Sequence, residues 1–181
     1  MKGKVIIFSA PSGAGKTTVV KHILGRYPAL EFSISATSRP PREGETHGKD
    51  YFFISTDEFK KKIANNEFVE YEEVYPGRFY GTLKCELDRI WDKGGYVVFD
   101  VDVKGGLNLK RIFGSDALAV FISPPDLQTL RQRLEKRATD SRENIEIRVQ
   151  KAAEEMAYSH QFDTILYNDA IATTLSEAEK L

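Results

Sequence analysis

Cysteine is nearly absent from this chain of 181 residues, in which Cys85 is the only one. A disulfide framework within the chain is therefore excluded, and a reducing compartment is expected. We expect Cys85 itself to be a small, partly buried apolar residue. The histidines His22, His47 and His160 are scattered and lack the spacing of a metal site. A centre built from cysteine or histidine ligands is therefore not predicted.

The chain also lacks an excess of charge of either sign and any long apolar run. It has 26 basic and 27 acidic residues, with a net charge of −1 at pH 7. This balance argues against a general binder of nucleic acid or of membrane surfaces. No stretch approaches the ~20 apolar residues of a membrane span, and the first apolar run is too short for a secretory signal. We therefore expect a cytoplasmic protein that binds neither nucleic acid nor membrane.

Apolar, β-branched runs alternate with amphipathic stretches along most of the chain. Strands are expected at 4–9, 96–100, 117–122 and 164–167, and helices at 16–27, 83–93, 126–137, 143–160 and in the tail. This alternation predicts an α/β fold with a parallel sheet. Residues 34–83 break the rhythm and are interpreted as an insertion within a single domain, 1–181. Inside and beside it we expect strands at 32–37 and 50–55, a helix opened by a capping box at 55–65, and a hairpin at 68–82.

The segment at 9–18 lies between the first predicted strand and the first predicted helix. It matches the phosphate-loop pattern G-x-x-x-x-G-K-[ST], except that Ala10 replaces the first glycine. In such a loop backbone N–H groups face phosphate oxygens, Lys16 supplies positive charge and the Thr17 hydroxyl is a ligand for Mg²⁺. We expect the alanine to leave this chemistry intact; the loop alone does not separate ATP from GTP. The predicted phosphate-binding residues are Ala10, Pro11, Ser12, Gly13, Ala14, Gly15, Lys16, Thr17 and Thr18.

Two acidic residues, Asp100 and Asp102, stand at the end of the apolar run at 96–100. Ligands gather at the carboxyl ends of parallel strands. A carboxylate there, beside a phosphate loop, commonly orders Mg²⁺ or its waters. Asp100 and Asp102 are therefore further candidates for the metal site, acting through water. The alternative for each is an aspartate that caps a helix or faces solvent.

The predicted insertion carries residue types suited to a second phosphate and to a base. Arg39 and Arg42 are separated by two prolines, and arginine forks match phosphate oxygens. Tyr51 and Tyr80 could add hydroxyl donors. Glu70 lies among apolar and aromatic residues, where its carboxylate could accept hydrogens from guanine N1 and the amino group. Adenine offers no such donor pair, so a buried glutamate would reject it.

Four segments in chain order, at 35–51, 66–70, 80–82 and 99–102, resemble guanylate kinases. The most specific is Arg-Pro-Pro-Arg-Glu-Gly-Glu at 39–45, followed by Gly-Lys-Asp-Tyr at 48–51. The resemblance implies a P-loop NTPase fold with a mixed α/β GMP-binding insertion and a helical lid. The implied parts are a core (about 1–33, 84–124 and 161–181), the insertion (about 34–83) and the lid (about 125–160).

The resemblance also implies roles for individual residues. Guanine would contact Ser35, Glu70 and Thr82; the GMP phosphate would contact Arg39, Arg42, Tyr51 and Tyr80; Glu45 and Asp100 would lie beside GMP and position these groups. The implied catalytic residues are Lys16, Arg39, Arg133, Arg137 and Arg148, and the lid arginines Arg133 and Arg137 also bind ATP, with Asn168 at its adenine. Ala138 stands where the family usually has glycine at the lid hinge.

The implied reaction is ATP + GMP → ADP + GDP, with Mg²⁺ as cofactor, expected also on dGMP, in purine nucleotide metabolism and GMP recycling. A monomer or a small homo-oligomer is expected. Two alternatives stay open. One is a phosphate-loop kinase acting on another nucleoside monophosphate or a ribosyl phosphate. The other is a guanylate-kinase-like module that binds phosphorylated peptides, which would not need Lys16, Thr17 or the lid arginines.

Overall fold

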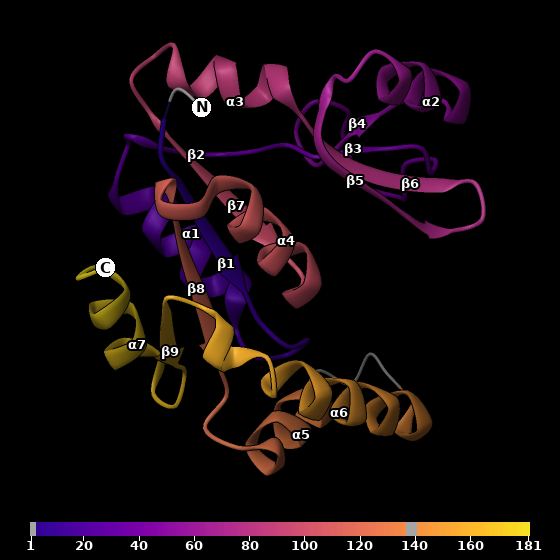
Figure 1. The fold of residues 1–181 in the computed structure, drawn as a ribbon. Helices are drawn as coiled ribbons and strands as arrows, with labels where there is room; N and C mark the ends of the chain where they lie inside the picture. The colour runs from indigo at the N-terminus through magenta and orange to yellow at the C-terminus, as the bar shows by residue number, and fades with distance from the viewer. Residues whose placement is uncertain (1–2, 137–140) are drawn as a thin grey trace. The chain divides into compact units, whose positions relative to one another are not determined.

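A computed structural model describes residues 3–136 and 141–181 (Figure 1). The chain divides into two compact units. One unit comprises Gly3–Leu30 and Val98–Leu181, and the other comprises Glu31–Val97. The second unit contains the whole of the predicted insertion at 34–83.

The larger sheet is five-stranded, with the order β2-β7-β1-β8-β9. Its strands are β1 (Val5–Ser9), β2 (Leu30–Phe32), β7 (Tyr96–Val101), β8 (Ala117–Ser123) and β9 (Thr164–Tyr167). The helices of the first unit are α1 (Lys16–Arg26), α4 (Val103–Phe113), η1 (Gly114–Asp116), α5 (Leu127–Lys136), α6 (Arg142–Met156), η2 (Ser159–Gln161) and α7 (Ile171–Ala178). β1 pairs in parallel with β8, and β8 in parallel with β9. The predicted α/β class with a parallel sheet is confirmed.

Neighbouring residues of a strand point to opposite faces of the sheet. Because consecutive residues of these strands are apolar, both faces of the sheet are apolar, and helices cover both. On β7, Val98 belongs to an apolar cluster that includes Val19 of α1 and Ala178 of α7. The next residue, Phe99, contacts Phe113 of α4, with ring centroids 6.0 Å apart. α1 and α7 therefore cover one face and α4 the other, while α5 and α6 pack against each other (Figure 1).

The helix α4 was missing from the sequence prediction, which named no element between Asp100 and Ala117. Gly105 and Gly106 lie in its first turn and weaken the helical pattern of the sequence. The helix forms nonetheless, because Asp102 caps it by accepting a hydrogen bond from the Gly105 N–H at 2.7 Å. Buried apolar residues of α4 then pack against the sheet and supply stabilisation that local propensity does not.

The second unit has a four-stranded sheet with the order β4-β3-β6-β5. Its elements are β3 (Ala36–Thr37), β4 (Phe52–Phe53), α2 (Thr56–Ala64), β5 (Phe68–Tyr75), β6 (Arg78–Leu83) and α3 (Lys84–Trp91). The predicted hairpin is confirmed by the antiparallel pairing of β5 with β6. β3 and β4, however, pair in parallel, which the expectation of hairpins in this segment did not foresee.

The core of the second unit is built largely from phenylalanine. Phe59 of α2 is fully buried and stacks on Phe68 and Phe79, with ring centroids 4.3 Å and 5.4 Å away. The predicted cap of α2 is present, because Ser55 accepts a hydrogen bond from the Glu58 N–H at 3.1 Å. These contacts attach α2 to the hairpin, which carries candidate site residues.

Cys85 does not have the burial that its residue type predicts. Cys85 is exposed at the start of α3, so the prediction of a partly buried residue was wrong. The residues that α3 buries instead are Glu86, Leu87 and Ile90. In residues 3–136 and 141–181, no helix has the length and apolar character to cross a membrane.

The loop before β9 contains a carboxylate that we expect to contribute measurably to stability. Asp163 Oδ2 accepts hydrogen bonds from the Ala119 N–H at 2.7 Å and from Lys110 Nζ at 2.8 Å. Burial alone would raise the pKa of Asp163, but these two donors outweigh it and lower the pKa. Asp163→Ala removes the acceptor from a fully buried N–H and should lower the free energy of unfolding by about 1–2 kcal/mol.

Urea unfolding of Asp163→Ala measures this loss, and Asp88→Ala, at an exposed position of α3, is the matched control. Because the folded-state pKa is lowered, the stabilisation is complete above the usual aspartate pKa of about 3.9. It is lost as the pH falls through the lowered pKa, so the two stability curves should converge in acid. A loss that persists unchanged at low pH would contradict this assignment.

Candidate active site

The phosphate loop connects β1 to α1 in the first unit. Gly13 and Gly15 have φ values of 94° and 95°, a conformation that residues with a side chain rarely adopt. Gly15 is the N-cap of α1, and no side chain caps this helix or places a negative charge in its first turn. The Thr18 N–H donates to the Gly15 carbonyl at 3.1 Å. The N–H groups of Lys16 and Thr17 precede it and are available to an anion, which the helix dipole favours there.

Ala10 occupies the position of the first motif glycine. It is 7% exposed. Among the described residues that are not glycine, only Asn66 has a positive φ. Ala10 thus adopts a backbone conformation that suits any residue. The replacement imposes no backbone strain on the loop.

Lys16 follows the loop at the start of α1. Its Nζ forms an ion pair with Asp100 Oδ1 at 2.5 Å and donates a hydrogen bond to the Val101 carbonyl at 2.5 Å. Both partners lie at the carboxyl end of β7, which neighbours β1 in the sheet. The structure therefore places the predicted phosphate-binding lysine in contact with one of the predicted acids.

The other predicted acid, Asp102, has the helix-capping function that was the alternative to a role at the metal. Besides capping α4, it accepts a hydrogen bond from Ser9 Oγ on its carbonyl oxygen at 3.1 Å. It thereby joins the start of the phosphate loop to the start of α4. The hydroxyl-bearing residue Thr17 is exposed in the first turn of α1.

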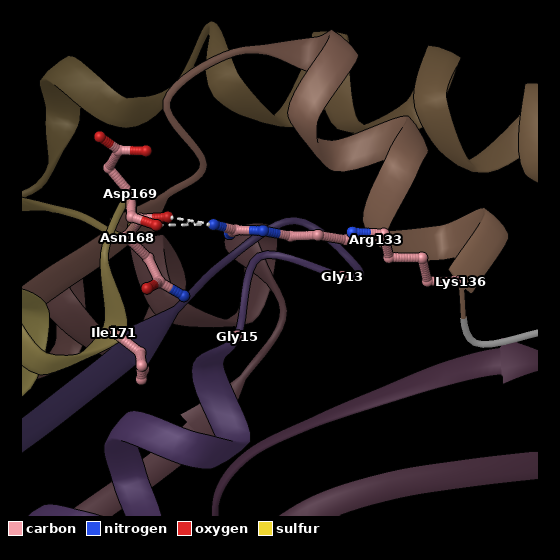
Figure 2. A pocket seen from close by; sticks show the side chains of 7 residues that line it. All are labelled: Gly13, Gly15, Arg133, Lys136, Asn168, Asp169 and Ile171. Atoms are coloured by element: carbon pink, nitrogen blue, oxygen red, sulfur yellow. Dashed lines mark hydrogen bonds between the residues drawn. The ribbon is translucent and has the colours of Figure 1, made fainter.

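A pocket of about 420 Å³ lies beside the phosphate loop (Figure 2). It is lined by Gly13, Gly15, Arg133, Lys136, Asn168, Asp169 and Ile171. Figure 2 shows Arg133 extending from α5 toward the chain after β9, where its Nη2 donates to the carbonyls of Asn168 and Asp169 at 2.8 Å and 3.1 Å. Its Nη1 is buried and has no hydrogen-bond partner within the described residues. A buried donor of this kind is costly unless it finds an acceptor, such as an anionic ligand in the pocket.

Lys136 was missed by the sequence analysis, although it lines the same pocket as Arg133. The two residues are three apart on α5, and residues at that spacing share a helix face. This spacing was the signal that could have found Lys136. Both residues add positive charge to the pocket.

Of the two remaining arginines predicted in the lid, the structure describes Arg148 only. Arg148 of α6 lies near the phosphate loop, with its Nη1 3.5 Å from Ser12 Oγ. Arg137 and the hinge position Ala138 lie outside the described residues. The structure therefore brings Arg133 and Arg148, from two helices, to the phosphate loop.

Asn168, expected at the adenine, contacts the phosphate loop itself. It is 5% exposed, and its Nδ2 donates a hydrogen bond to the Ala14 carbonyl at 2.7 Å. Its Oδ1 lies 3.2 Å from the Thr174 hydroxyl, and its backbone N–H donates to the Ser123 carbonyl at 2.7 Å. No feature of the local sequence indicates this contact between residues 154 positions apart.

In the second unit, the candidate base-reading residues face each other on the hairpin. Glu70 of β5 lies opposite Thr82 of β6, and the Thr82 hydroxyl donates to Glu70 Oε1 at 2.8 Å. Thr82 is 1% exposed. Ser35 lies just before β3, and its carbonyl accepts a hydrogen bond from the Phe52 N–H at 2.9 Å.

The candidate phosphate-binding residues gather around Arg39, which is 6% exposed. Arg39 Nε donates to the Tyr80 hydroxyl at 3.2 Å, and its guanidinium lies 5.0 Å from the ring centre of Tyr51. Its two Nη atoms donate to the two carboxylate oxygens of Glu45 at 2.6 Å and 2.7 Å. Tyr80 and Thr82 point to the same face of β6, about 7 Å apart. A base-reading candidate, Thr82, and a phosphate-binding candidate, Tyr80, are therefore neighbours on β6.

The charges of Arg39 and Glu45 do not change with pH in the physiological range. Hydrogen bonds from the Arg39 side chain and from the Arg42 N–H lower the pKa of Glu45 to about 2. Glu45 in turn raises the pKa of Arg39. Burial raises the pKa of Tyr51, so that its hydroxyl stays neutral and can donate. The cluster thus presents a charged Arg39 guanidinium and a neutral Tyr51 hydroxyl throughout the physiological range.

A phosphate loop at the carboxyl end of the central strand of a parallel sheet, with a lysine in it and arginines close to it, defines an α/β nucleotide-binding protein of the phosphate-loop class. The Guanylate kinase family model matches residues 2–181, and the chain belongs to this family. The guanylate kinase of Bacteroides fragilis (strain NCTC 9343) is 53% identical over 180 residues, which are 99% of this chain and 88% of that protein. The guanylate kinase of Porphyromonas gingivalis (strain W83) is 51% identical over 178 residues, or 98% and 95% of the two chains.

A solved structure supports the same assignment of the fold. The crystal structure of guanylate kinase from Anaplasma phagocytophilum is similar with a TM-score of 0.71 and 27% sequence identity. The match covers 98% of this chain and 83% of that chain. The P-loop NTPase fold expected from the sequence is therefore confirmed.

Proposed function

We infer that the chain is an enzyme that transfers a phosphoryl group from ATP to GMP, in the reaction ATP + GMP → ADP + GDP. The observation that carries this inference is the hydrogen-bonded pair of Glu70 and Thr82, which lies about 7 Å along β6 from Tyr80, the residue that accepts a hydrogen bond from Arg39. This arrangement offers a carboxylate to a guanine and a cation to the phosphate of the same nucleotide. Membership of the guanylate kinase family supports the inference independently.

The residues act by neutralising charge and by positioning two anionic substrates. Lys16 and the N–H groups of the phosphate loop bind the ATP phosphates, and Arg133 and Arg148 stabilise the group in flight, as we propose also for Arg137. The GMP phosphate is already ionised when it attacks, so no general base is required. The positive charge that Lys16 and the arginines provide matters most when negative charge spreads over the transferred group.

The acceptor site that we propose comprises residues of the second unit together with Asp100. Guanine contacts Ser35, Glu70 and Thr82, and the GMP phosphate contacts Arg39, Arg42, Tyr51 and Tyr80. Glu45 is a positioning residue, because it holds both Nη atoms of Arg39. The ribose 2′-hydroxyl has no assigned partner in this set, so we expect dGMP to be accepted as well.

Mg²⁺ is the metal that the residues present would suit. The Thr17 hydroxyl and the carboxylates of Asp100 and Asp102 are oxygen donors at the phosphate end of the site. Among the described residues there is no group of three acidic, cysteine or histidine side chains able to hold a metal. Mg²⁺ suits this composition, since it commonly binds through one or two protein oxygens, substrate phosphates and waters. When bound, it would neutralise phosphate charge.

Further parts of the proposal rest on the family and on composition. We propose that Asn168 and the phosphate loop, residues 10–18, bind ATP, and that residues 125–160 form the lid of a single guanylate-kinase domain. A cytoplasmic location fits the single cysteine. We propose a role in purine nucleotide metabolism and GMP recycling, as a monomer or small homo-oligomer without nucleic-acid or membrane partners.

An acceptor panel tests the function. ADP formation from ATP and Mg²⁺ would be followed with GMP, dGMP, AMP, CMP or UMP as acceptor. We expect GMP to be the best acceptor and to exceed AMP by at least about a hundredfold in kcat/KM, because adenine cannot satisfy the Glu70 carboxylate. Equal use of GMP and AMP would refute the base-reading role. No activity with any acceptor, together with binding of phosphorylated peptides, would favour the interaction module.

A further inference from the structure

The contact between Asn168 and the phosphate loop is made with the side-chain amide, at the end of β9. Asn168 Nδ2 donates to the Ala14 carbonyl at 2.7 Å, and both residues are buried. A carbonyl oxygen only accepts hydrogen bonds, so the amide nitrogen must face it. In Figure 2 this nitrogen points to the loop, close to Gly15.

The bonded carbonyl belongs to the peptide unit that joins Ala14 to Gly15. A trans peptide is planar, so its C=O and its N–H point in opposite directions. A hydrogen bond that holds the Ala14 carbonyl toward Asn168 therefore directs the Gly15 N–H away from Asn168. Gly15 is the N-cap of α1, where N–H groups face the anion that the loop binds.

We propose that Asn168 is a positioning residue of the phosphate loop, which sets the orientation of the Ala14–Gly15 peptide and so aims the Gly15 N–H at the phosphates. The proposal rests on the ATP site described under the proposed function. It assigns to Asn168 a role toward the phosphates, in addition to the contact with adenine expected from the family.

The packing of Gly15 supports this role. A side-chain carbon added to Gly15 would lie 2.2 Å from Asn168 Nδ2, so the amide lies directly against the loop backbone. With φ at 95°, glycine tolerates several peptide orientations that other residues do not. The loop therefore needs an outside contact to select one of them, and Asn168 supplies it.

Asn168 is itself held in place from two other elements. Its N–H donates to the carbonyl of Ser123, the last residue of β8. Its Oδ1 lies 3.2 Å from the buried Thr174 hydroxyl of α7, which also has the carbonyls of Tyr167 and Ala170 within reach. The amide is thus fixed to the sheet and adjoins α7, and the loop is positioned relative to both.

Calorimetric titration with ATP and with inorganic tripolyphosphate separates this role from a contact with adenine, since tripolyphosphate has no base. We expect Asn168→Ala to weaken both ligands by a similar factor, about tenfold, because the Ala14 carbonyl loses its donor. GMP affinity, which depends on the second unit, and the thermal midpoint report whether the variant is folded. Asn108→Ala on α4 is the matched control and should bind both ligands as the unaltered protein does.

Unchanged tripolyphosphate affinity with weakened ATP affinity would overturn the proposal and leave adenine contact as the role of Asn168. Lys16→Met serves as the reference for the ATP site. If that variant binds tripolyphosphate as well as the unaltered protein, the proposed ATP site is wrong and this proposal falls with it. The two failures are therefore distinguishable.

A second variant of the same size makes the hydrogen bond to the Ala14 carbonyl depend on pH. In Asn168→Asp a carboxylate faces the Ala14 carbonyl, and burial raises the pKa of such a carboxyl group. We expect this variant to bind tripolyphosphate more weakly than Asn168→Ala at pH 8. Toward about pH 5.5, the protonated carboxyl donates to Ala14, and binding relative to the unaltered protein should improve several-fold. A ratio that stays flat with pH would also overturn the proposal.

Discussion

Lys16→Met should lower the turnover number for GMP phosphorylation by about a thousandfold. Lys16 is the cation at the start of α1, where the free N–H groups of the helix already attract an anion. Methionine keeps the length and the apolar stem but removes the charge that offsets the negative charge of the transferred group. The measurement is steady-state turnover with saturating ATP and GMP.

In the structure Lys16 also neutralises Asp100, so the variant leaves that carboxylate without its 2.5 Å partner. Urea unfolding and GMP titration therefore accompany the assay and show whether the loss of turnover occurs in folded protein. Lys21→Met is the matched control, since Lys21 is exposed on the same helix and should be replaceable at no cost. Retention of a tenth or more of the turnover in Lys16→Met would contradict the mechanism.

Glu70→Ala should lower kcat/KM for GMP by about a hundredfold or more while leaving ATP affinity unchanged. The carboxylate would lose two hydrogen bonds to guanine, each of the charge-assisted kind that is worth about 1.5–3 kcal/mol. The effect should be confined to guanine nucleotides, so the preference for GMP over AMP should fall. Kinetics with both acceptors and calorimetry with ATP measure the two parts of the prediction.

Glu73→Ala is the control for this change. Glu73 is exposed on the same strand, three residues along, and therefore points to the opposite face, where its Oε1 accepts a hydrogen bond from the Gly77 N–H of the hairpin turn at 2.7 Å. It should bind GMP normally. Equal losses in Glu70→Ala and Glu73→Ala would indicate that the hairpin, and not the base-reading carboxylate, had been disturbed. The two variants also differ at Thr82, whose hydroxyl loses its hydrogen-bond acceptor at 2.8 Å in Glu70→Ala and keeps it in Glu73→Ala.

The features that sequence analysis predicted well are those encoded by neighbouring residues. The strand β1, the loop and the helix α1 follow from an apolar run, two glycines with φ near 95° and a helical stripe. The hairpin of β5 and β6 follows from β-prone residues on both sides of the turn at Gly77, whose φ is 75°. In each case the signal and the structure span the same few residues.

The features that it missed depend on packing between distant residues. α4 contains glycine in its first turn, and only the cap at Asp102 and burial against the sheet make it a helix. The parallel pairing of Ala36 with Phe52 joins strands separated by a long loop, for which no local pattern exists. Local propensity is a weak guide in such places because tertiary contacts supply the larger share of the free energy.

The phosphate loop shows most clearly which features the local sequence encodes and which depend on packing between distant residues. By itself the sequence determined which residues form the loop, that Lys16 is its cation, and which family the acceptor segment resembles, because these properties reside in the order of adjacent residues. Only the tertiary structure decided that Lys16 pairs with Asp100, that Arg133 lines the pocket beside the loop, that Arg148 lies near Ser12, and that Asn168 holds the Ala14 carbonyl. Those contacts join residues far apart in the chain, and the folding of the sheet and its helices brings them within hydrogen-bonding distance.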